Sequence, residues 1–511
     1  MIVLVALVAL LLYGLAVWRK ERTSPLRKVP GPWYAPWTSL PLAYLYSRGT
    51  IWKHVQSSHQ KYGDVVRLGP RNVWVAKPAR DVFSKKTDFP KTAVYAELAA
   101  NRHYPGLVGE IRNENHRQLR RLFEPAFTTG SVDALEPVFT SCLAALMDNY
   151  SNMAVRGLDG FDTDLMVDLH HLALDIIGET CFGQRFGQVD KLFSSNSTRT
   201  KEQEAWSKIP RAIFEGQARR YRTVFLKRFL RRFGWDMTFS WPQFMTQAIT
   251  NLIDERQSRA KAGGQPVRED ILHHFLNNGQ AATKGDAGAP AGMEMNHQYI
   301  IDNMSEIFLT GSETSAYTMT CFCMEMARNP DVAEKLYASL PVLGPQDSLI
   351  SDKSIRESEN FEYLEACIKE VLRLHPVISE LGRHCMRDDY EVDGYRLPKH
   401  TILCASVMRL QRHEKYWPQP MRFWPERWLS DEPESVDPST QEAYMPFSHG
   451  NHACIGKRYA YAEMRTVLVN LFSRFRVTEV AEQKVDFRLY VTMQFYDNSW
   501  KAKLVPRWKC G

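Results

Sequence analysis

The sequence predicts a mainly α-helical protein with a minor, separate β part. Between about residues 114 and 260, apolar side chains recur at i, i+3 and i+4, which is the spacing of helices that bury one face. Tyr299 to Arg328 forms a single long helical pattern, which ends before Pro330 because the residue preceding a proline avoids helical backbone angles. Strand-like alternation is confined to short stretches at residues 61–77, 389–408 and after 475.

The composition is that of a large folded protein. The chain has 511 residues, of which 44% are hydrophobic and 24% charged, enough to bury a sizeable core. We expect one large domain over residues 46–511. The formal net charge of +7 comes with no recognisable nucleic-acid module, so no nucleic-acid partner is expected. The basic balance favours an anionic membrane surface or an acidic protein partner, and a solvated basic surface is the plain alternative.

The first residues predict a membrane anchor. Ile2 to Trp18 is an unbroken apolar run, followed at once by Arg19 and Lys20. A spanning helix needs about 17–25 apolar residues, so residues 1–18 are expected to form a single-pass transmembrane anchor. A cleaved signal peptide is the alternative, but no basic segment precedes the run and no small-residue cleavage site follows it. Because the basic residues follow the span, we expect the body to lie in the cytosol, at the endoplasmic reticulum membrane.

Prolines and glycines mark the connecting segments. Residues 19–45 are basic and rich in proline, which predicts a stiff hinge between anchor and body. Residues 61–77 alternate around a Gly-Pro turn and predict a β-hairpin. Residues 276–297 are rich in Gly, Ala and Asn and predict a surface loop. Residues 208–232 mix basic and aromatic side chains, which predicts an amphipathic helix that either packs on the body or contacts a membrane.

One of the nine cysteines needs a chemical explanation. The cysteines are scattered without C-x-x-C pairs, which argues against a disulfide framework and against a zinc site. Cys454 lies between Gly450 and Gly456, just ahead of a helical pattern that starts near Tyr459. Backbone N–H groups and the positive end of a helix aimed at a sulfur stabilise a thiolate. A thiolate with no other ligating side chain nearby suits an axial heme ligand, and a buried structural cysteine beside a turn is the alternative.

The segment Phe447 to Gly456 also carries a family resemblance. Its pattern F-x-x-G-x-x-x-C-x-G resembles the heme-ligand signature of the cytochrome P450 family, and the chain looks like a microsomal, fungal member. The resemblance implies the cytochrome P450 fold, with a large helical domain and a small β-sheet region. It implies heme b (iron protoporphyrin IX) as cofactor, with Cys454 as the metal ligand and Phe447 among the cofactor-binding residues. Residues 46–511 would then be a heme-thiolate catalytic domain.

Two further segments resemble motifs of the same family. Glu370 and Arg373, at i and i+3 of a helical run, resemble the family's E-x-x-R motif, and Arg427 would complete a buried network with them. Thr310 to Ser315 resembles the oxygen-activation motif, in which Glu313 and Thr314 would relay protons to dioxygen as catalytic residues. The first motif position is usually Ala or Gly, and Thr310 departs from that. A solvent-facing polar stretch is the plain alternative.

Four basic or aromatic side chains are expected to bind the heme propionates. His116 and Arg120, at i and i+4, resemble the family's W-x-x-x-R motif with His in place of Trp. Arg383 follows the E-x-x-R helix, where the family often places a propionate-binding arginine. His452 stands where most members have Arg, and because histidine is shorter and titrates near neutrality we expect heme retention to be weaker or more dependent on pH. A solvated basic helix is the plain alternative for the first pair.

The resemblance also implies partners and an activity. The chain would insert one oxygen atom from O2 into a lipophilic small molecule, such as a steroid, a terpenoid or another secondary metabolite. Electrons would come from an NADPH-dependent flavoprotein reductase, because the chain has no dinucleotide fingerprint of its own. A basic patch would receive that reductase, formed by Arg117, Arg121, Lys457 and Arg458. A reductase-independent isomerase or dehydratase, and a non-catalytic heme-binding protein, are the alternatives.

Overall fold

A computed structural model of the protein describes residues 2–508, with gaps at 78–79, 84–87, 100–104, 158, 263–268, 284–295 and 430–439. Between 191 and 239 it describes Trp206, Lys208, Ile213, Gly216, Phe233 and Gly234 alone. The predicted amphipathic segment 208–232 therefore lies almost wholly outside the described residues.

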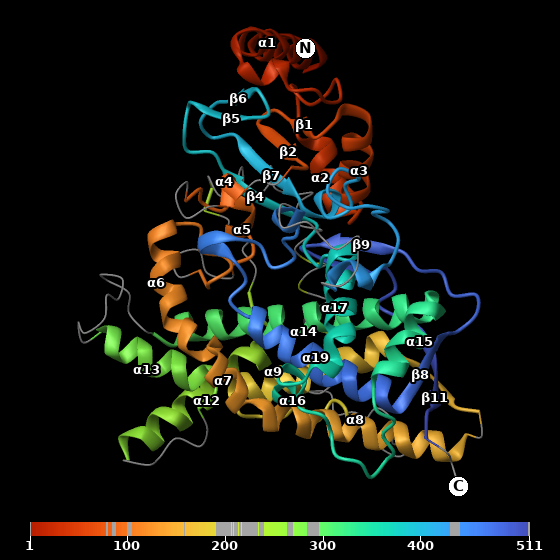
Figure 1. The fold of residues 1–511 in the computed structure, drawn as a ribbon. Helices are drawn as coiled ribbons and strands as arrows, with labels where there is room; N and C mark the ends of the chain where they lie inside the picture. Colours follow the sequence, from red (N-terminus) through yellow and green to blue (C-terminus); the bar gives the residue numbers. More distant parts are fainter. Residues whose placement is uncertain are drawn as a thin grey trace.

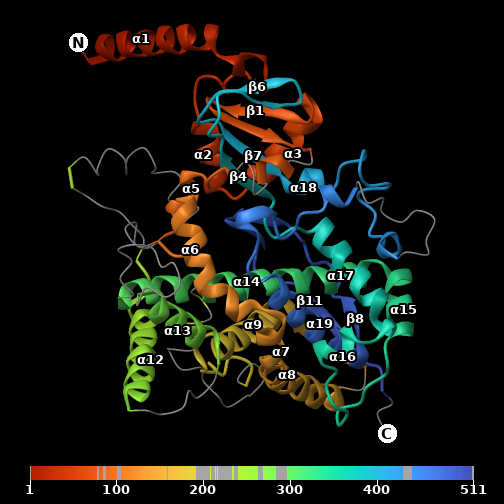
Figure 2. The same cartoon turned by 60° about the vertical axis from the view of Figure 1, so that its left-hand side comes forward.

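Helices form most of the body, below the main sheet in Figures 1 and 2. The longer ones are α3 (Ile51–Tyr62), α6 (Asn113–Phe123), α8 (Glu136–Arg156), α9 (Leu165–Phe182), α12 (Gln243–Lys261), α13 (Ile271–Thr283), α14 (His297–Arg328), α15 (Pro330–Ser339), α17 (Glu362–Leu374) and α19 (Lys457–Arg474). Shorter ones are α2 (Leu40–Ser47), α4 (Arg80–Phe83), α5 (Ala93–Ala96), α7 (Thr129–Ala134), α16 (Asp352–Arg356) and α18 (Val407–Leu410). Single 3-10 turns are η1 (Pro25–Lys28), η2 (Glu124–Phe127), η4 (Glu359–Phe361), η5 (Pro425–Trp428), η6 (Thr440–Ala443) and η7 (Gly450–His452).

The long helix α14 crosses the whole body (Figure 1). It begins at the Asn296 cap, whose side chain accepts from the Tyr299 N–H, and it ends before Pro330, as predicted. It packs along α9, and a Cβ at Gly311 would lie 2.7 Å from the Cδ1 atom of Ile177. Glycine at this position therefore lets the two helices approach closely, which offsets its low helix propensity.

The strands form small sheets, of which the four-stranded one lies at the upper end in Figure 2. Its order is β1 (Val65–Gly69), β2 (Asn72–Val75), β7 (Ile402–Ser406) and β4 (Glu380–His384). The predicted hairpin is confirmed, because β1 and β2 pair antiparallel. The other sheets are β3 (Phe161–Asp164), β11 (Lys501–Pro506) and β8 (Phe475–Glu479); β9 (Phe487–Tyr490) and β10 (Thr492–Phe495); and β5 (Tyr390–Val392) and β6 (Tyr395–Leu397). The mainly helical class with a minor β part is confirmed.

The predicted loop at residues 276–297 is wrong at its start. Helix α13 continues to Thr283, because Phe275 and Leu276 are buried and the Phe275 ring stacks on Phe123 with centroids 4.3 Å apart. This packing holds the helix through a stretch whose sequence alone shows little periodicity. Residues 284–295 lie outside the described part of the chain.

The N-terminal helix α1 (Ile2–Thr23) extends sideways from the sheet end of the molecule (Figure 2). Within the described residues, no helix combines the length and apolar character needed to cross a membrane, so the spanning anchor stays a prediction. The segment predicted as a hinge contains η1 and the start of α2. It is tied to β1, because the Arg67 guanidinium hydrogen-bonds Glu21 and the Leu26 carbonyl. Pro25 and Pro41 sit in the first turns of these helices, where proline is tolerated.

Candidate active site

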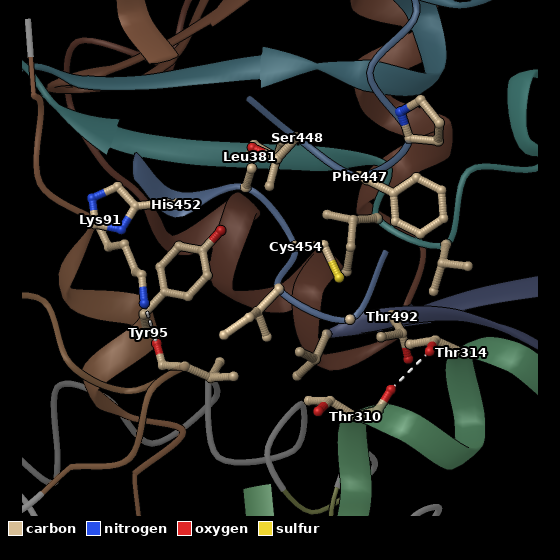
Figure 3. A pocket seen from close by; sticks show the side chains of 18 of the residues that line it. Lys91, Tyr95, Thr310, Thr314, Leu381, Phe447, Ser448, His452, Cys454 and Thr492 are labelled. Carbon is tan, nitrogen blue, oxygen red and sulfur yellow. Dashed lines mark hydrogen bonds between the residues drawn. The ribbon is translucent and has the colours of Figure 1, made fainter. Parts of the chain in front are cut away.

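A cavity of about 450 Å³ lies between the four-stranded sheet and α14. This volume is within the usual range of small-molecule sites. All of the predicted site residues except Glu313 line it, namely His116, Arg120, Thr314, Arg383, Phe447, His452 and Cys454. Figure 3 shows the Cys454 sulfur pointing into this space, with Thr310 and Thr314 of α14 beyond it and Lys91 and His452 to one side.

The Cys454 loop has the geometry that the sequence predicts. The loop reverses through Ser448 and Gly450, whose φ angles are +59° and +71°, and α19 begins at Lys457. The Cys454 N–H donates to the Phe447 carbonyl at 2.9 Å, which closes the turn. Cys454 is exposed to the cavity, whereas the other described cysteines are buried. The sulfur is therefore presented at the cavity wall rather than packed in the core.

The charge state of Cys454 reflects two opposing effects. Burial raises the pKa of the Cys454 thiol above its ordinary value. The Gly456 backbone N–H and the cationic side chains of Arg120 and Lys457 act against this rise, as they favour the thiolate. The loop thus provides the predicted thiolate-stabilising groups, but burial outweighs them. A bound cation at the sulfur would shift the balance to the thiolate.

Helix α14 presents a row of hydroxyl groups at the cavity. The Thr314 hydroxyl donates to the Thr310 carbonyl at 2.7 Å, and the Thr310 hydroxyl donates to the Glu306 carbonyl at 2.8 Å. Both threonines line the cavity, together with Gly311, Ser315 and others. The solvent-facing alternative for this segment is therefore wrong. Each hydroxyl donates within the helix in this structure, and rotation about its Cβ–O bond would turn the same proton toward the cavity.

Glu313 does not line the cavity. Successive helix positions differ by about 100°, so Glu313 and Thr314 cannot face the same side of α14. The Glu313 carboxylate instead faces α9, where its Oε1 atom lies 3.1 Å from Nε2 of His170. Both side chains are buried. The sequence could not reveal this pair, because nothing in its spacing links residue 170 to residue 313.

Basic side chains crowd one side of the cavity. Arg383 is 2% exposed, and burial lowers its pKa. The Arg120 guanidinium donates to the Ala453 carbonyl at 2.6 Å, which ties α6 to the cysteine loop. The His116 and His452 rings lie against each other with centroids 4.3 Å apart. His116 Nδ1 and His452 Nε2 are buried and have no hydrogen-bond partner among the described residues.

Lys91 belongs to the same basic group, although it was not among the predicted site residues. Its ammonium group donates to the carbonyls of Leu107 and Val108 at 2.8 and 2.9 Å, and its backbone pairs with Arg383. Burial, followed by the charge of Arg383, lowers the pKa of Lys91 to about 7. The only sequence signal was a lysine placed directly after the Phe89-Pro90 pair in a largely apolar stretch.

The pKa of His452 lies well below the ordinary value of a histidine. Burial, and then the charges of Arg383, Lys91 and Arg120, lower the pKa of His452 to about 2. The imidazole is therefore neutral at pH 7 in this structure. This differs from the expected titration near neutrality, whereas the weaker or more pH-dependent heme retention stays a prediction.

These residues fit a flat, dianionic cofactor. Lys91 and Arg383 are buried basic groups on one side of the cavity, and Arg120, which also pairs with Glu124 at 3.0 Å, is partly buried beside them. The described residues offer no hydrogen-bond partner to the neighbouring imidazole nitrogens, His116 Nδ1 and His452 Nε2. Buried positive charges are unfavourable unless an anion pairs with them. Two carboxylates on one edge of a ligand, as in heme b, would supply that pairing, and Cys454 would be the ligand of its iron.

The predicted E-x-x-R network is present behind the site. Glu370 accepts two hydrogen bonds from Arg373, at 2.7 and 2.8 Å, and one from Arg427 at 3.1 Å. Trp428 Nε1 and the Trp424 N–H donate to the same carboxylate, each at 2.9 Å. All three charged side chains are fully buried. The network joins α17 to η5 and has no contact with the cavity, since none of these residues lines it.

Taken together, the fold and site define a mainly helical enzyme with a cysteine facing a hydroxyl-lined helix across a cofactor-sized cavity. A cytochrome P450 family model matches residues 29–496. The chain is 26% identical to cytochrome P450 monooxygenase acrD of Aspergillus aculeatus, over 90% of this chain and 87% of that protein. It is 26% identical to cytochrome P450 monooxygenase LUC2 of a Fusarium species, over 96% and 90%. It is 27% identical to cytochrome P450 monooxygenase stcF of Emericella nidulans, over 95% and 94%.

The chain belongs to the cytochrome P450 family. It is a cytochrome P450 monooxygenase, and the cofactor of this family is heme b.

Proposed function

We propose that this enzyme inserts one atom of O2 into a lipophilic small molecule and reduces the other to water, with two electrons that NADPH supplies through a flavoprotein reductase. The observation that carries the proposal is the Cys454 sulfur, exposed to the cavity opposite Thr314 of α14. Bound heme, with Cys454 as its thiolate ligand, would supply the dioxygen chemistry, because thiolate ligation favours O–O cleavage.

The chain's own residues hold the cofactor and handle protons in this proposal. Lys91, Arg120 and Arg383 bind the propionates, and the nitrogens of His116 and His452 donate further hydrogen bonds to them. Thr314 holds a proton at its Oγ1 atom and passes it toward the reacting oxygen. Glu313 does not reach the cavity itself. It lies next to Thr314 in the helix, and with His170 at 3.1 Å it would supply a second group that can carry a proton.

The substrate is lipophilic because apolar side chains form most of the cavity wall. They include Leu98, Leu107, Ile177, Ile307, Val377, Leu381 and Leu489. The relatives named above are fungal monooxygenases, which fits an oxidation in secondary metabolism.

A basic patch beside the cysteine loop would receive the reductase. Its members Arg117, Arg121, Lys457 and Arg458 are all exposed. They come from α6 and the start of α19, and the Arg120–Ala453 hydrogen bond ties α6 to the cysteine loop that precedes α19. Exposed cations close in sequence to Cys454 and on the helix tied to its loop would attract an acidic flavoprotein surface.

The helix α1 would attach the enzyme to the endoplasmic reticulum membrane, with the body on the cytosolic side. Its large apolar side chains are exposed, among them Leu4, Val5, Leu7, Leu11 and Leu12. Basic residues follow them, which suits contact with anionic lipid headgroups. Removal of residues 2–23 should lower the fraction of enzyme that sediments with phospholipid vesicles, and an unchanged fraction would contradict this attachment.

The proposed reaction is tested by reconstitution with NADPH and a microsomal reductase under ¹⁸O2, with a steroid, a terpenoid and a long-chain alcohol as substrates. We expect one labelled oxygen in the product, and no product without reductase.

The double variant R121E/R458E should slow reduction of the enzyme about tenfold, most strongly at low salt, while Lys399→Glu, outside the patch, should not. Product formed without NADPH and reductase would instead indicate an isomerase or dehydratase, and a failure to oxidise any substrate would favour a non-catalytic heme protein.

A further inference from the structure

The four-stranded sheet forms a wall of the cavity, and one of its faces supplies most of the sheet residues there. Trp74 of β2 pairs with Cys404 of β7, and Cys404 pairs with Gly382 of β4, so these three side-chain positions lie in one row across the sheet. Residues two apart on a strand share a face. The same face therefore carries Asn72, Trp74, Ile402, Cys404, Glu380 and Gly382, and all of them line the cavity.

Glu380 is the one charged residue of these six. Its Oε2 atom accepts a hydrogen bond from Trp74 Nε1 at 2.6 Å, and Trp74 is 1% exposed. Among the described residues, no side chain or backbone group hydrogen-bonds its Oε1 atom, and no Lys, Arg or His forms an ion pair with it. Burial raises the pKa of Glu380 to about 7, against the effect of the indole hydrogen bond. A carboxyl group in an apolar wall is thus left with an open acceptor.

The other carboxyl group of the cavity wall is differently engaged. Glu306 of α14 accepts from the Val108 N–H at 2.7 Å. A Cβ at Gly106 would lie 2.5 Å from the Glu306 carboxyl carbon, so this loop packs directly on the carboxylate. The charge of Lys91 lies near as well. Glu306 therefore fastens a loop to α14. Glu380 has no such loop packed on its carboxyl group among the described residues, and Trp74 is its hydrogen-bond donor.

We propose that Glu380 is a specificity-determining residue, which accepts a hydrogen bond from an O–H or N–H group of the lipophilic substrate and so fixes its orientation in the cavity. The inference rests on the proposed function and narrows its substrate class to apolar molecules that carry a hydrogen-bond donor. Trp74 holds the carboxyl group in place, which leaves Oε1 as the recognition atom. A substrate without a donor would cover this cavity-facing oxygen without giving it a hydrogen bond, and that is the basis of discrimination.

The test compares donor and non-donor molecules of the same length. Primary alcohols of ten to sixteen carbons and their methyl ethers are titrated into the holoenzyme, with calorimetry and the Soret shift as readouts. Wild type should bind each alcohol roughly tenfold more tightly than its ether, as a hydrogen bond to a charged or strongly polar acceptor predicts. Glu380→Leu should abolish the preference, and Glu380→Gln should keep part of it, because the amide oxygen still accepts.

Glu391→Gln is the matched control, since Glu391 is an exposed carboxylate on β5 outside the cavity. Its alcohol preference should equal that of wild type. The inference is overturned if wild type binds alcohol and ether equally, if the preference survives in Glu380→Leu, or if none of the alcohols binds. A reduced carbon monoxide spectrum is recorded for each sample. If the red-shifted Soret band is present, the proposed function stands and a negative result counts against Glu380 alone. If the band is absent, the proposed function itself has failed.

Discussion

Glu370→Gln is expected to lower the free energy of unfolding by about 3–5 kcal/mol, the usual effect of removing one partner from a buried ion pair. The carboxylate is fully buried and accepts hydrogen bonds from Arg373, Arg427 and two tryptophan N–H groups. An amide of the same shape keeps one acceptor oxygen but leaves two buried guanidinium groups without a counter-charge. Chemical denaturation of the holoenzyme, followed by circular dichroism, measures the change.

The matched control for this prediction is Glu362→Gln, on the same helix. Glu362 is exposed in the first turn of α17, so its loss should change stability by less than about 1 kcal/mol through the helix dipole. A Glu370→Gln protein with the denaturation midpoint of wild type would show that the network does not stabilise the fold. Because the network does not line the cavity, heme spectra of folded Glu370→Gln should be unchanged.

Thr314→Ala is expected to lower product formation roughly 100-fold, as loss of a positioned proton donor does. NADPH consumption should continue, with its electrons appearing as hydrogen peroxide, because dioxygen is still reduced but its O–O bond is no longer cleaved productively. The Thr314 hydroxyl lines the cavity and is held by the Thr310 carbonyl at 2.7 Å. The ratio of product to NADPH, with any substrate that wild type oxidises, is the measurement.

Ser312→Ala separates this catalytic role from a structural one. The Ser312 hydroxyl also donates to a carbonyl one turn earlier, that of Phe308 at 3.1 Å, but Ser312 does not line the cavity. Its loss should leave the product ratio within about twofold of wild type. Equal losses in the two variants would mean that the hydroxyl groups act through the shape of α14 and would count against a proton-transfer role for Thr314.

The sequence predicted those parts of the site that follow from local pattern. The glycines around Cys454 and the helix after it led to the loop geometry, and the i, i+3 spacing of Glu370 and Arg373 led to their ion pair. Thr314 was placed on the cavity side of α14 by its motif. In each case the interacting groups are close in sequence or belong to one recognisable segment, so secondary structure alone brings them together.

The remaining parts of the site depend on long-range packing. Lys91 reaches the cavity because a loop folds back on α14, and Glu313 faces His170 because α9 packs on that side of the helix. The low pKa of His452 arises from burial beside Arg383 and Lys91, which are far away in the sequence. Glu380 meets Trp74 only through the order of strands in the sheet. No local pattern contains this information.

The central claim is that Cys454 is the thiolate ligand of heme b, and the reduced carbon monoxide difference spectrum of wild type and Cys454→Ser tests it most directly. We expect wild type to show a strongly red-shifted Soret band and Cys454→Ser to lack it. A wild-type band at the position of histidine-ligated heme, or a red-shifted band that persists in Cys454→Ser, would contradict the assignment and with it the proposed reaction.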